Sequence, residues 1–435
     1  MTHINATTGL GCMNSTTPHI VIVGAGFAGL ACAKALGNAP ARVTIVDRAN
    51  YHLFVPLLYQ VATAALSPAD IARPIRRILG RYRNIDVVLG EVTAIDTEAR
   101  TVTTTTATIS PYDRLVVAMG SRYSYFGHND WAERAKGPRS LDDARSIRTQ
   151  LLTAFERADS TQDKVERDRL MTVIVIGGGP TGVEMAGAVA ELVRHSLARD
   201  FRHIDPRTAR ILLIEAGPRL LSGFPQSLSD YAKRAVEKLG VTVKLGEPVQ
   251  ELSERGATVG GRMVPAGTMI WGAGIEASPG MRMLGVPLDR SGRVAVNPDL
   301  SVPDMPGVYV LGDSATLRGE DGQPLPALAQ VAAQEGDYLG RSLAAEFRGR
   351  RGGKPFRFHN RGNTAVIGRN AAVFDFGRFR LRGRVAWVLW AIVHIYLLIG
   401  FENRLSVTLR WIWRYISGES GARLITPGEG GERAP

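Results

Sequence analysis

Short apolar runs that end near a glycine recur along the chain. HIVIVG (19–24) and MTVIVIG (171–177) are continuous apolar stretches, and a glycine-rich turn and a segment of helix-forming residues follow each of them. Apolar runs of about four to eight residues bounded by turn residues are typical of fully buried strands, and strands that alternate with helical segments indicate parallel sheets. The pattern therefore predicts an α/β fold. Further strands are expected in ARVTIVDR (41–48), RLVVAMGS (114–121), ILLIEAG (211–217), TMIWGAGI (268–275) and GVYVLGDSA (307–315).

Both glycine turns have the spacing GxGxxG, as GAGFAG (24–29) and GGGPTG (177–182). In such a turn the first glycine bends the chain tightly, the second lets the backbone approach a pyrophosphate, and the third lets the helix pack on its strand. The N-terminus of that helix then holds the phosphates. The sequence thus predicts two Rossmann-like dinucleotide-binding domains. The residues expected to contact the two nucleotides are Gly24, Gly26, Phe27, Ala28, Gly29, Asp47 and Arg48 in the first domain, and Gly177, Gly179, Pro180, Thr181, Gly182 and Glu215 in the second.

An acidic residue ends the strand that follows each loop. Asp47 comes 23 residues after Gly24, and Glu215 comes 38 residues after Gly177, with the extra length in a long helical stretch and a basic connection. A carboxylate at this position accepts hydrogen bonds from a ribose hydroxyl and repels a 2′-phosphate, so NADH is favoured over NADPH. Arg219, four residues beyond Glu215, leaves NADPH open as the alternative.

The two halves of the chain repeat one order of elements: glycine loop, acidic strand end, β-rich stretch, and an apolar strand ending in AMGS or GAGI. This internal repeat indicates that one nucleotide domain is inserted into another. We expect the first domain at 18–139 and 276–375, and the second at 140–275. The small residues at the two strand ends are expected beside the nucleotides; they are Gly120 and Ser121 in the first domain, and Gly272, Ala273 and Gly274 in the second.

A third apolar strand ends in Gly312-Asp313. Asp313 suits a ribityl hydroxyl or phosphate-side group of a flavin dinucleotide, and the alternative for it is a helix N-cap. The segment PLPALAQ (324–330) then places a proline just before a helix through VAAQEGDYLGRSLAAEF. The positive end of that helix could stabilise the charge of a reduced flavin.

Composition restricts the partners. The net charge of +12, with a pI near 10.0, suggests a polyanionic surface, either nucleic acid or an anionic membrane. No nucleic-acid motif is present, so nucleic-acid binding is not expected. The only cysteines, Cys12 and Cys32, form no CxxC, which excludes disulfide redox chemistry and thiolate metal sites; no metal is expected. Residues 1–17 lack the pattern of a signal peptide and are interpreted as a disordered extension, with the nucleotide domains in the cytosol.

The C-terminal region, 376–435, combines apolar, aromatic and arginine residues. VAWVLWAIVHIYLLIGF (385–401) contains no formal charge over 17 residues, slightly fewer than the ~20 that span a bilayer. Arginines flank it, and Trp411 and Trp413 alternate with Arg410 and Arg414 further on. Such a mixture is typical of an amphipathic helix lying among lipid headgroups, so we expect a monotopic membrane anchor rather than a span. His394 is expected to be a packing residue.

Taken together, these motifs resemble the type II NADH dehydrogenases, single-subunit NADH:quinone oxidoreductases that use FAD and pump no protons. The similarity runs from about residue 18 to about 425. The blocks that carry it are GAGFAGL, NYHLFVPLLYQVATAAL (50–66), VVAMGS, IGGGPTGVEMAG, GDSA, AQVAAQEG (329–336) and RLITP (423–427).

The resemblance implies FAD in the first domain, NADH in the second, and a quinone, ubiquinone or menaquinone, near the 329–336 helix. Gln330 and Gln334 match the family's quinone motif, which Glu335 and Gly336 complete, and Gln330 would also contact FAD. Glu184 matches a glutamate beside the nicotinamide and the flavin. The residues that would line the approach to the flavin are Leu53, Phe54, Pro56, Leu57, Leu58 and Tyr59. The family further implies a homodimer on the cytoplasmic face of the cell inner membrane. Catalytic candidates are therefore Glu184, Gln330, Gln334 and Glu335.

Two other functions remain open from the sequence. A flavoprotein reductase of a soluble electron-carrier protein shares the same nucleotide domains but needs no lipid anchor. A non-enzymatic flavoprotein that senses NADH would reoxidise slowly with every quinone. A sulfide:quinone oxidoreductase is disfavoured because that chemistry needs cysteines near the flavin.

Overall fold

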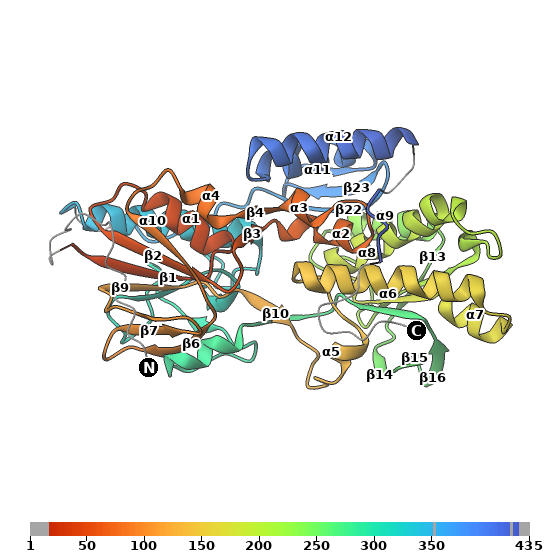
Figure 1. Ribbon diagram of the computed structural model, residues 1–435, viewed down its shortest axis with the longest axis horizontal. Helices are drawn as coiled ribbons and strands as arrows, with labels where there is room; N and C mark the ends of the chain where they lie inside the picture. Colours follow the sequence, from red (N-terminus) through yellow and green to blue (C-terminus); the bar gives the residue numbers. More distant parts are fainter. Residues whose placement is uncertain (1–16, 351–353, 418–420, 426–435) are drawn as a thin grey trace. The chain divides into compact units, whose positions relative to one another are not determined.

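The computed structural model describes residues 17–350, 354–417 and 421–425 (Figure 1). The extension predicted for 1–17 lies almost wholly outside these residues. The described chain forms two compact units, and it passes from one to the other after residues 52, 73, 121, 275 and 359. The first unit contains residues up to 52, 74–121 and 276–359, and the second contains 53–73, 122–275 and the residues from 360 onwards.

The first unit is built on a five-stranded sheet in the order β20-β9-β1-β2-β5, in which every neighbouring pair is parallel. Its central strand β1 places Val21 opposite Thr44 of β2 and Leu115 of β9. Helices α1 and α10 pack together, and Gly336 of α10 lies directly on the carbonyl of Ala28. The bounds are β1 His19–Val23, α1 Phe27–Ala35, β2 Arg42–Asp47, α4 Ile75–Leu79, β5 Ile85–Leu89, β9 Arg114–Val117, β20 Val308–Val310 and α10 Ala329–Glu346.

The second unit repeats this plan with a four-stranded parallel sheet, β13-β12-β11-β17. In both units the strand before the glycine loop lies between the strand with the acidic end and the later apolar strand. The repeat and the two Rossmann-like sheets are therefore confirmed. The bounds are α6 Leu141–Ser160, α7 Lys164–Leu170, β11 Thr172–Ile176, α8 Pro180–Glu191, β12 Arg210–Glu215, α9 Gln226–Lys238, β13 Val241–Leu245 and β17 Thr268–Trp271.

Each β-rich stretch forms a small antiparallel sheet of its own, β6-β7-β8 in the first unit and β14-β15-β16 in the second. Their bounds are β6 Val92–Asp96, β7 Thr101–Thr104, β8 Thr108–Ile109, β14 Val249–Ser253, β15 Gly256–Val259 and β16 Arg262–Pro265. Minor elements complete the units: β3 Tyr51–Leu53, β4 Ala72–Pro74, β10 Ser121–Tyr123, α5 Trp131–Arg134, β18 Ile275–Ala277, β19 Val294–Ala295 and β21 Ala315–Thr316.

Three segments expected in the first domain belong to the second unit; they are 53–73, 122–139 and 360–375. Residues 53–73 carry α2 (Leu58–Ala62), which packs on α6 and α8, and α3 (Pro68–Ile71). Residues 360–375 carry β22 (Asn363–Gly368) and β23 (Ala371–Asp375), and α8 approaches the backbone of β22 so closely that Gly187 lies on the carbonyl of Ile367. These tertiary contacts, which the order of elements along the chain does not show, decide the division.

The apolar C-terminal stretch is divided between two helices. After β24 (Arg380–Arg382), α11 covers Arg384–Leu397 and α12 covers Phe401–Ser417, with a break at Gly400, whose φ is 95°. Within the described part of the chain, no helix combines the length and apolarity needed to cross a bilayer.

Candidate functional site

The first glycine loop forms a cradle that fits a pyrophosphate. Gly24, at φ 98°, lies against the Ala118 carbonyl, and Gly29 lies against the Gly24 carbonyl, so a side chain at either position would collide with backbone. Gly26 differs, because no atom of the described residues lies within 4 Å of the place that its Cβ would take. The open space in front of the second glycine is where a dinucleotide would pass, which is the role this position has in such loops. The residues present therefore fit the FAD that the resemblance implies.

Asp47 closes this loop as predicted from its position. Its Oδ2 accepts from the Ala25 N–H at 2.6 Å, and its Oδ1 accepts from the Ala49 N–H at 2.8 Å. A carboxylate has further lone pairs, so both oxygens can still accept from a ribose hydroxyl. Burial raises the pKa of Asp47. Of its predicted neighbours, Arg48 is exposed, and the Phe27 ring meets His52 edge-on with 5.2 Å between the ring centroids.

The second loop repeats this arrangement bond for bond. Gly177, at φ 104°, lies against the backbone of Gly272 and Ala273, Gly182 lies against Gly177, and Gly179 faces open space. Glu215 takes the place of Asp47: its Oε2 accepts from the Gly178 N–H and its Oε1 from the Gly217 N–H, the latter at 2.6 Å.

Other predicted contacts of the second loop lie nearby. Pro180 and Thr181 begin α8, and the Thr181 side chain bonds to Tyr123. Gly274, at φ 74°, accepts from the Ser124 N–H at 3.3 Å. Arg219 is occupied, because its guanidinium donates to the Ser222 carbonyl at 2.6 Å and to the Phe224 carbonyl at 2.8 Å.

Three predicted segments of the first unit meet at Gly312. The Ser121 hydroxyl donates to Asp313 Oδ2 at 2.6 Å, and the Gly312 N–H donates to Glu335 Oε2 at 2.6 Å. Ser314 Oγ donates to the carbonyl of Gly120 at 2.9 Å. Asp313 is the second residue of a short 3-10 turn rather than an N-cap. Burial raises the pKa of Glu335 to about 8, and nearby Asp313 adds to the effect.

The two predicted quinone glutamines have different surroundings. Gln330 is in the first turn of α10, as expected. Gln334 uses both ends of its amide on one backbone unit: Nε2 donates to the His359 carbonyl and Oε1 accepts from the His359 N–H, both at 3.0 Å. These two bonds fasten residue 359 to α10, so Gln334 has a structural task that the motif did not reveal.

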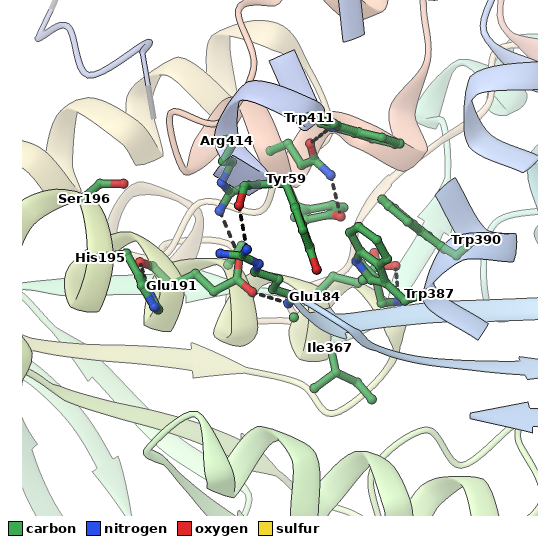
Figure 2. Close-up of a pocket in the computed structure, with 16 residues that line it drawn as sticks. Tyr59, Glu184, Glu191, His195, Ser196, Ile367, Trp387, Trp390, Trp411 and Arg414 are labelled. Atoms are coloured by element: carbon green, nitrogen blue, oxygen red, sulfur yellow. Dashed lines mark hydrogen bonds and ion pairs between the residues drawn. The ribbon is translucent and has the colours of Figure 1, made fainter. Parts of the chain in front are cut away.

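A cavity of about 100 Å³ lies within the second unit, between α2, α8, β22, α11 and α12. Because one water needs about 10–15 Å³ on this measure, the space can receive a ring-sized group. Three tryptophans and two tyrosines contribute to its wall, as do Glu184 and Glu191 of α8 (Figure 2). Glu184 accepts from the Val366 N–H at 3.4 Å, and removal from bulk water raises its pKa to about 8. Burial therefore favours the protonated form of Glu184.

The sequence did not predict the contacts that join α12 to this cavity. Trp411 Nε1 donates to Gln60 Oε1 at 2.8 Å, and Arg414 pairs with Glu191 at 3.0 Å. Arg410 pairs with the nearly buried Asp70 at 3.1 Å. Trp411 and Arg414, which the sequence placed among headgroups, therefore bond to the protein, whereas Arg410 pairs with Asp70 and keeps 45% of its side chain accessible. His394 is the predicted packing residue: it is buried, its Nδ1 bonds to the Trp390 carbonyl at 2.7 Å, and burial lowers its pKa to about 4.

The opposite side of α12 is apolar and exposed. Its stripe repeats every three or four residues, at Phe401, Leu405, Leu409, Ile412 and Ile416. Trp413 is also exposed, with 63% of its surface accessible, and α11 adds Val385, Val388, Ile392 and Tyr396. We call these exposed residues of α11 and α12 the apolar face. An apolar patch of this extent on one pair of helices marks an interaction surface.

The two cradles and their fold define the class of protein. Residues 18–336 match the family model described as pyridine nucleotide-disulphide oxidoreductase. A type II NADH:quinone oxidoreductase of Mycobacterium tuberculosis is 40% identical over 421 residues, covering 94% of this chain and 90% of that protein. The chain therefore belongs to the type II NADH:quinone oxidoreductases.

More distant proteins share the same extent of chain. An internal alternative NAD(P)H-ubiquinone oxidoreductase of Arabidopsis thaliana mitochondria is 29% identical, over 94% of this chain and 86% of that protein. The structure of NDH2 from Plasmodium falciparum in complex with NADH has a TM-score of 0.84 at 20% identity, over 94% of this chain and 100% of that chain. At that identity the match shows a common fold.

Proposed function

We propose that this protein oxidises NADH through a bound FAD and passes two electrons to a quinone. The observation that carries the proposal is the pair of glycine loops with the same structure. In each loop the second glycine faces open space, and a carboxylate accepts hydrogen bonds from the loop backbone. Bound FAD would accept a hydride from NADH and deliver two electrons to the quinone. Membership of the type II NADH:quinone oxidoreductases supports both half-reactions.

The residues of this chain would bind and orient the two nucleotides. Gly24, Gly26 and Asp47 would hold FAD by its pyrophosphate and ribose, while Gly177, Gly179 and Glu215 would hold NADH in the same way. Asp313, fixed by Ser121, would meet the polar chain of the flavin nucleotide. Glu335 would keep Gly312 in place, and Gln330 is the proposed contact from α10 to the quinone.

NADH is the proposed donor in preference to NADPH. A 2′-phosphate would meet the carboxylate of Glu215, which two backbone N–H groups hold in place. Arg219 is the nearby cation that could compensate the charge of a 2′-phosphate, but its guanidinium already donates to the carbonyls of Ser222 and Phe224. Both observations support the preference that the sequence indicated.

A membrane surface is the proposed partner of the apolar face. Ser406, Trp411 and Arg414 of α12 bond to the protein, whereas the apolar stripe of this helix is exposed. Because a quinone is dissolved in lipid, an interfacial helix pair would bring the enzyme to its substrate. The cytoplasmic face of the inner membrane, which the resemblance implies, is the proposed location. A homodimer, which the resemblance also implies, is the competing use of this surface.

The activity is tested by anaerobic mixing. NADH should bleach the flavin absorbance of the full-length protein, and a short-chain ubiquinone should restore it within the turnover time. Bleaching that persists in the presence of several ubiquinones and menaquinones would refute the proposal, and rapid recovery with a soluble electron-carrier protein alone would favour the soluble reductase.

The membrane contact is tested by flotation with liposomes that contain anionic lipid. Leu409→Glu combined with Ile412→Glu should abolish flotation while ferricyanide reduction by NADH stays unchanged, because ferricyanide needs no lipid. Unchanged flotation would refute the assignment. A change in molar mass by light scattering, without loss of flotation, would assign the face to a dimer.

A further inference from the structure

The loop between β10 and α5, residues 124–130, carries an exposed aromatic ring. Phe126 has 66% of its surface accessible, and its φ is 53°. This is the left-handed region, which a bulky L-residue rarely adopts. Residues held in such conformations persist only where the surrounding structure fixes them, and they gather at ligand-binding sites. The question is therefore what fixes this loop and what the ring faces.

The loop is fixed to the second unit by contacts on either side of Phe126. The Ser124 N–H donates to the Gly274 carbonyl at 3.3 Å, and the Ser124 carbonyl accepts from Nε1 of the buried Trp271 at 3.1 Å. Just before the loop, the side chain of Tyr123 bonds to Thr181 in the first turn of α8. The backbone that carries Phe126 is therefore attached both to the end of β17 and to the second glycine loop.

The Phe126 ring itself lies on Gly274. A Cβ at Gly274 would stand 2.5 Å from Cζ of this ring, so only a glycine allows so close an approach. The two residues before it, Gly272 and Ala273, lie against Gly177 of the second glycine loop. The end of β17 thus contacts the glycine loop through residues 272–273 and the Phe126 ring through residue 274.

The order of the strands indicates which half of the nucleotide this ring would meet. In the sheet β13-β12-β11-β17, Glu215 ends β12, the glycine loop follows β11, and Gly274 follows β17. A dinucleotide lies across the carboxyl ends of such strands, with its pyrophosphate at the glycine loop and its adenosine ribose at the acidic residue. Because β12 and β17 are on opposite sides of β11, the nicotinamide half extends toward β17 and Phe126.

We infer that Phe126 packs its exposed ring against the nicotinamide-ribose half of NADH. This inference rests on the proposed function and adds a contact that lies outside both glycine loops. A planar nicotinamide suits a phenylalanine, because aromatic rings attract one another in offset and edge-to-face arrangements. Ser124 and Trp271 are positioning residues, since they hold the backbone from which the ring projects.

The test compares binding of NAD⁺ and of ADP, which lacks the nicotinamide half, to the oxidised FAD-loaded protein by titration calorimetry. Phe126→Asn removes the ring and keeps a residue that tolerates the left-handed backbone. It should raise the Kd for NAD⁺ about fivefold, the effect of one aromatic contact, and leave the Kd for ADP unchanged. Phe126→Gly, which accepts the same backbone conformation, should give the same result.

Two further variants serve as controls. Phe126→Tyr keeps an aromatic ring and should bind NAD⁺ as the wild type does. Phe379→Asn removes a phenylalanine that is also exposed, in the turn between β23 and β24 of the second unit, and should change neither Kd. In steady-state assays with ferricyanide as the acceptor, Phe126→Asn should raise the KM for NADH by the same factor of about five.

The outcomes separate the two proposals. If NADH bleaches the wild-type flavin but Phe126→Asn and Phe126→Gly bind NAD⁺ as tightly as the wild type, the role of Phe126 is refuted and the proposed function stands. Equal weakening of NAD⁺ and ADP would also refute the contact with the nicotinamide half. If NADH does not bleach the wild-type flavin, the proposed function itself is refuted.

Discussion

Glu335→Gln should make the stability of the holoenzyme less sensitive to pH. Glu335 is 2% exposed, and its carboxyl group accepts from the Gly312 N–H. Burial raises its pKa from an ordinary 4.5 to about 8. Between these two values the native protein keeps the proton and the unfolded chain releases it. The contribution of Glu335 to the free energy of unfolding is therefore fully present below pH 4.5, and it is lost as the pH rises through 8.

The size of the effect follows from the same two pKa values. At 1.36 kcal/mol per pH unit, the difference between 4.5 and 8 corresponds to roughly 5 kcal/mol as an upper bound. The amide introduced by Glu335→Gln would be neutral at every pH, and any cost of burying it would be the same throughout. The stability of the variant minus that of the wild type should therefore rise steadily between pH 5 and 8 and level off above pH 8.

The assay is thermal unfolding of both holoenzymes from pH 5 to 9, with release of flavin fluorescence as the signal. The difference between the two proteins isolates Glu335, because the buried Glu184 contributes equally to both. A difference in midpoint that stays constant across this range would refute the reasoning, since it would mean that Glu335 is ionised in the native protein at neutral pH.

Three further predictions concern the loops, α12 and the cavity. Gly26→Ala should lower the FAD content, whereas Gly179→Ala should keep FAD and raise the KM for NADH about tenfold or more. Both variants should fold, since their Cβ atoms meet only open space. If either variant lost both nucleotides equally, the assignment of one nucleotide to each loop would be contradicted. Asp70→Ala should increase hydrogen exchange in α12 by a factor that corresponds to about 2–3 kcal/mol, because α12 loses both the ion pair from Arg410 and the hydrogen bond from Ser406 to this carboxylate. Unchanged exchange would show that other contacts hold the helix. Glu184→Gln should leave the rate of quinone reduction at pH 7 within about twofold of the wild-type rate. It should also remove the change in kcat that the wild type shows above pH 8, which a profile of kcat against pH would detect. A wild-type profile without an inflection near pH 8 would contradict a protonated Glu184.

The features predicted correctly from the sequence are those that depend on residues close together in the chain. The glycine spacing and the strand-end acids were enough to place Asp47 and Glu215 at their loops, because each lies at the end of the strand that follows the loop in the same small unit. The duplication was also visible, since its elements come in the same order along the chain. The division of the units was not, because segments 53–73 and 360–375 are assigned by packing against α8.

The cavity could not be predicted, because it depends on contacts between distant positions. Gln60 and Trp411 are 351 residues apart, and nothing in either segment indicates the other. Composition alone gave the same lipid-facing interpretation to Trp411 and Trp413, although one faces the protein and the other is exposed. Gln334 shows the same difficulty, since a motif gives the residue type but not the partner that its amide takes.

The closing carboxylate of the second loop has a consequence for how donor preference can change. Glu215 is both the group that would repel a 2′-phosphate and the acceptor that ties Gly178 and Gly217 together. The Glu215 side chain therefore determines both the selectivity for NADH and the conformation of the second loop. A substitution that admits NADPH by removing this carboxylate would also release two backbone N–H groups. An evolutionary or engineered exchange of donor would have to supply new acceptors for them at the same time, or let the incoming phosphate itself become that acceptor.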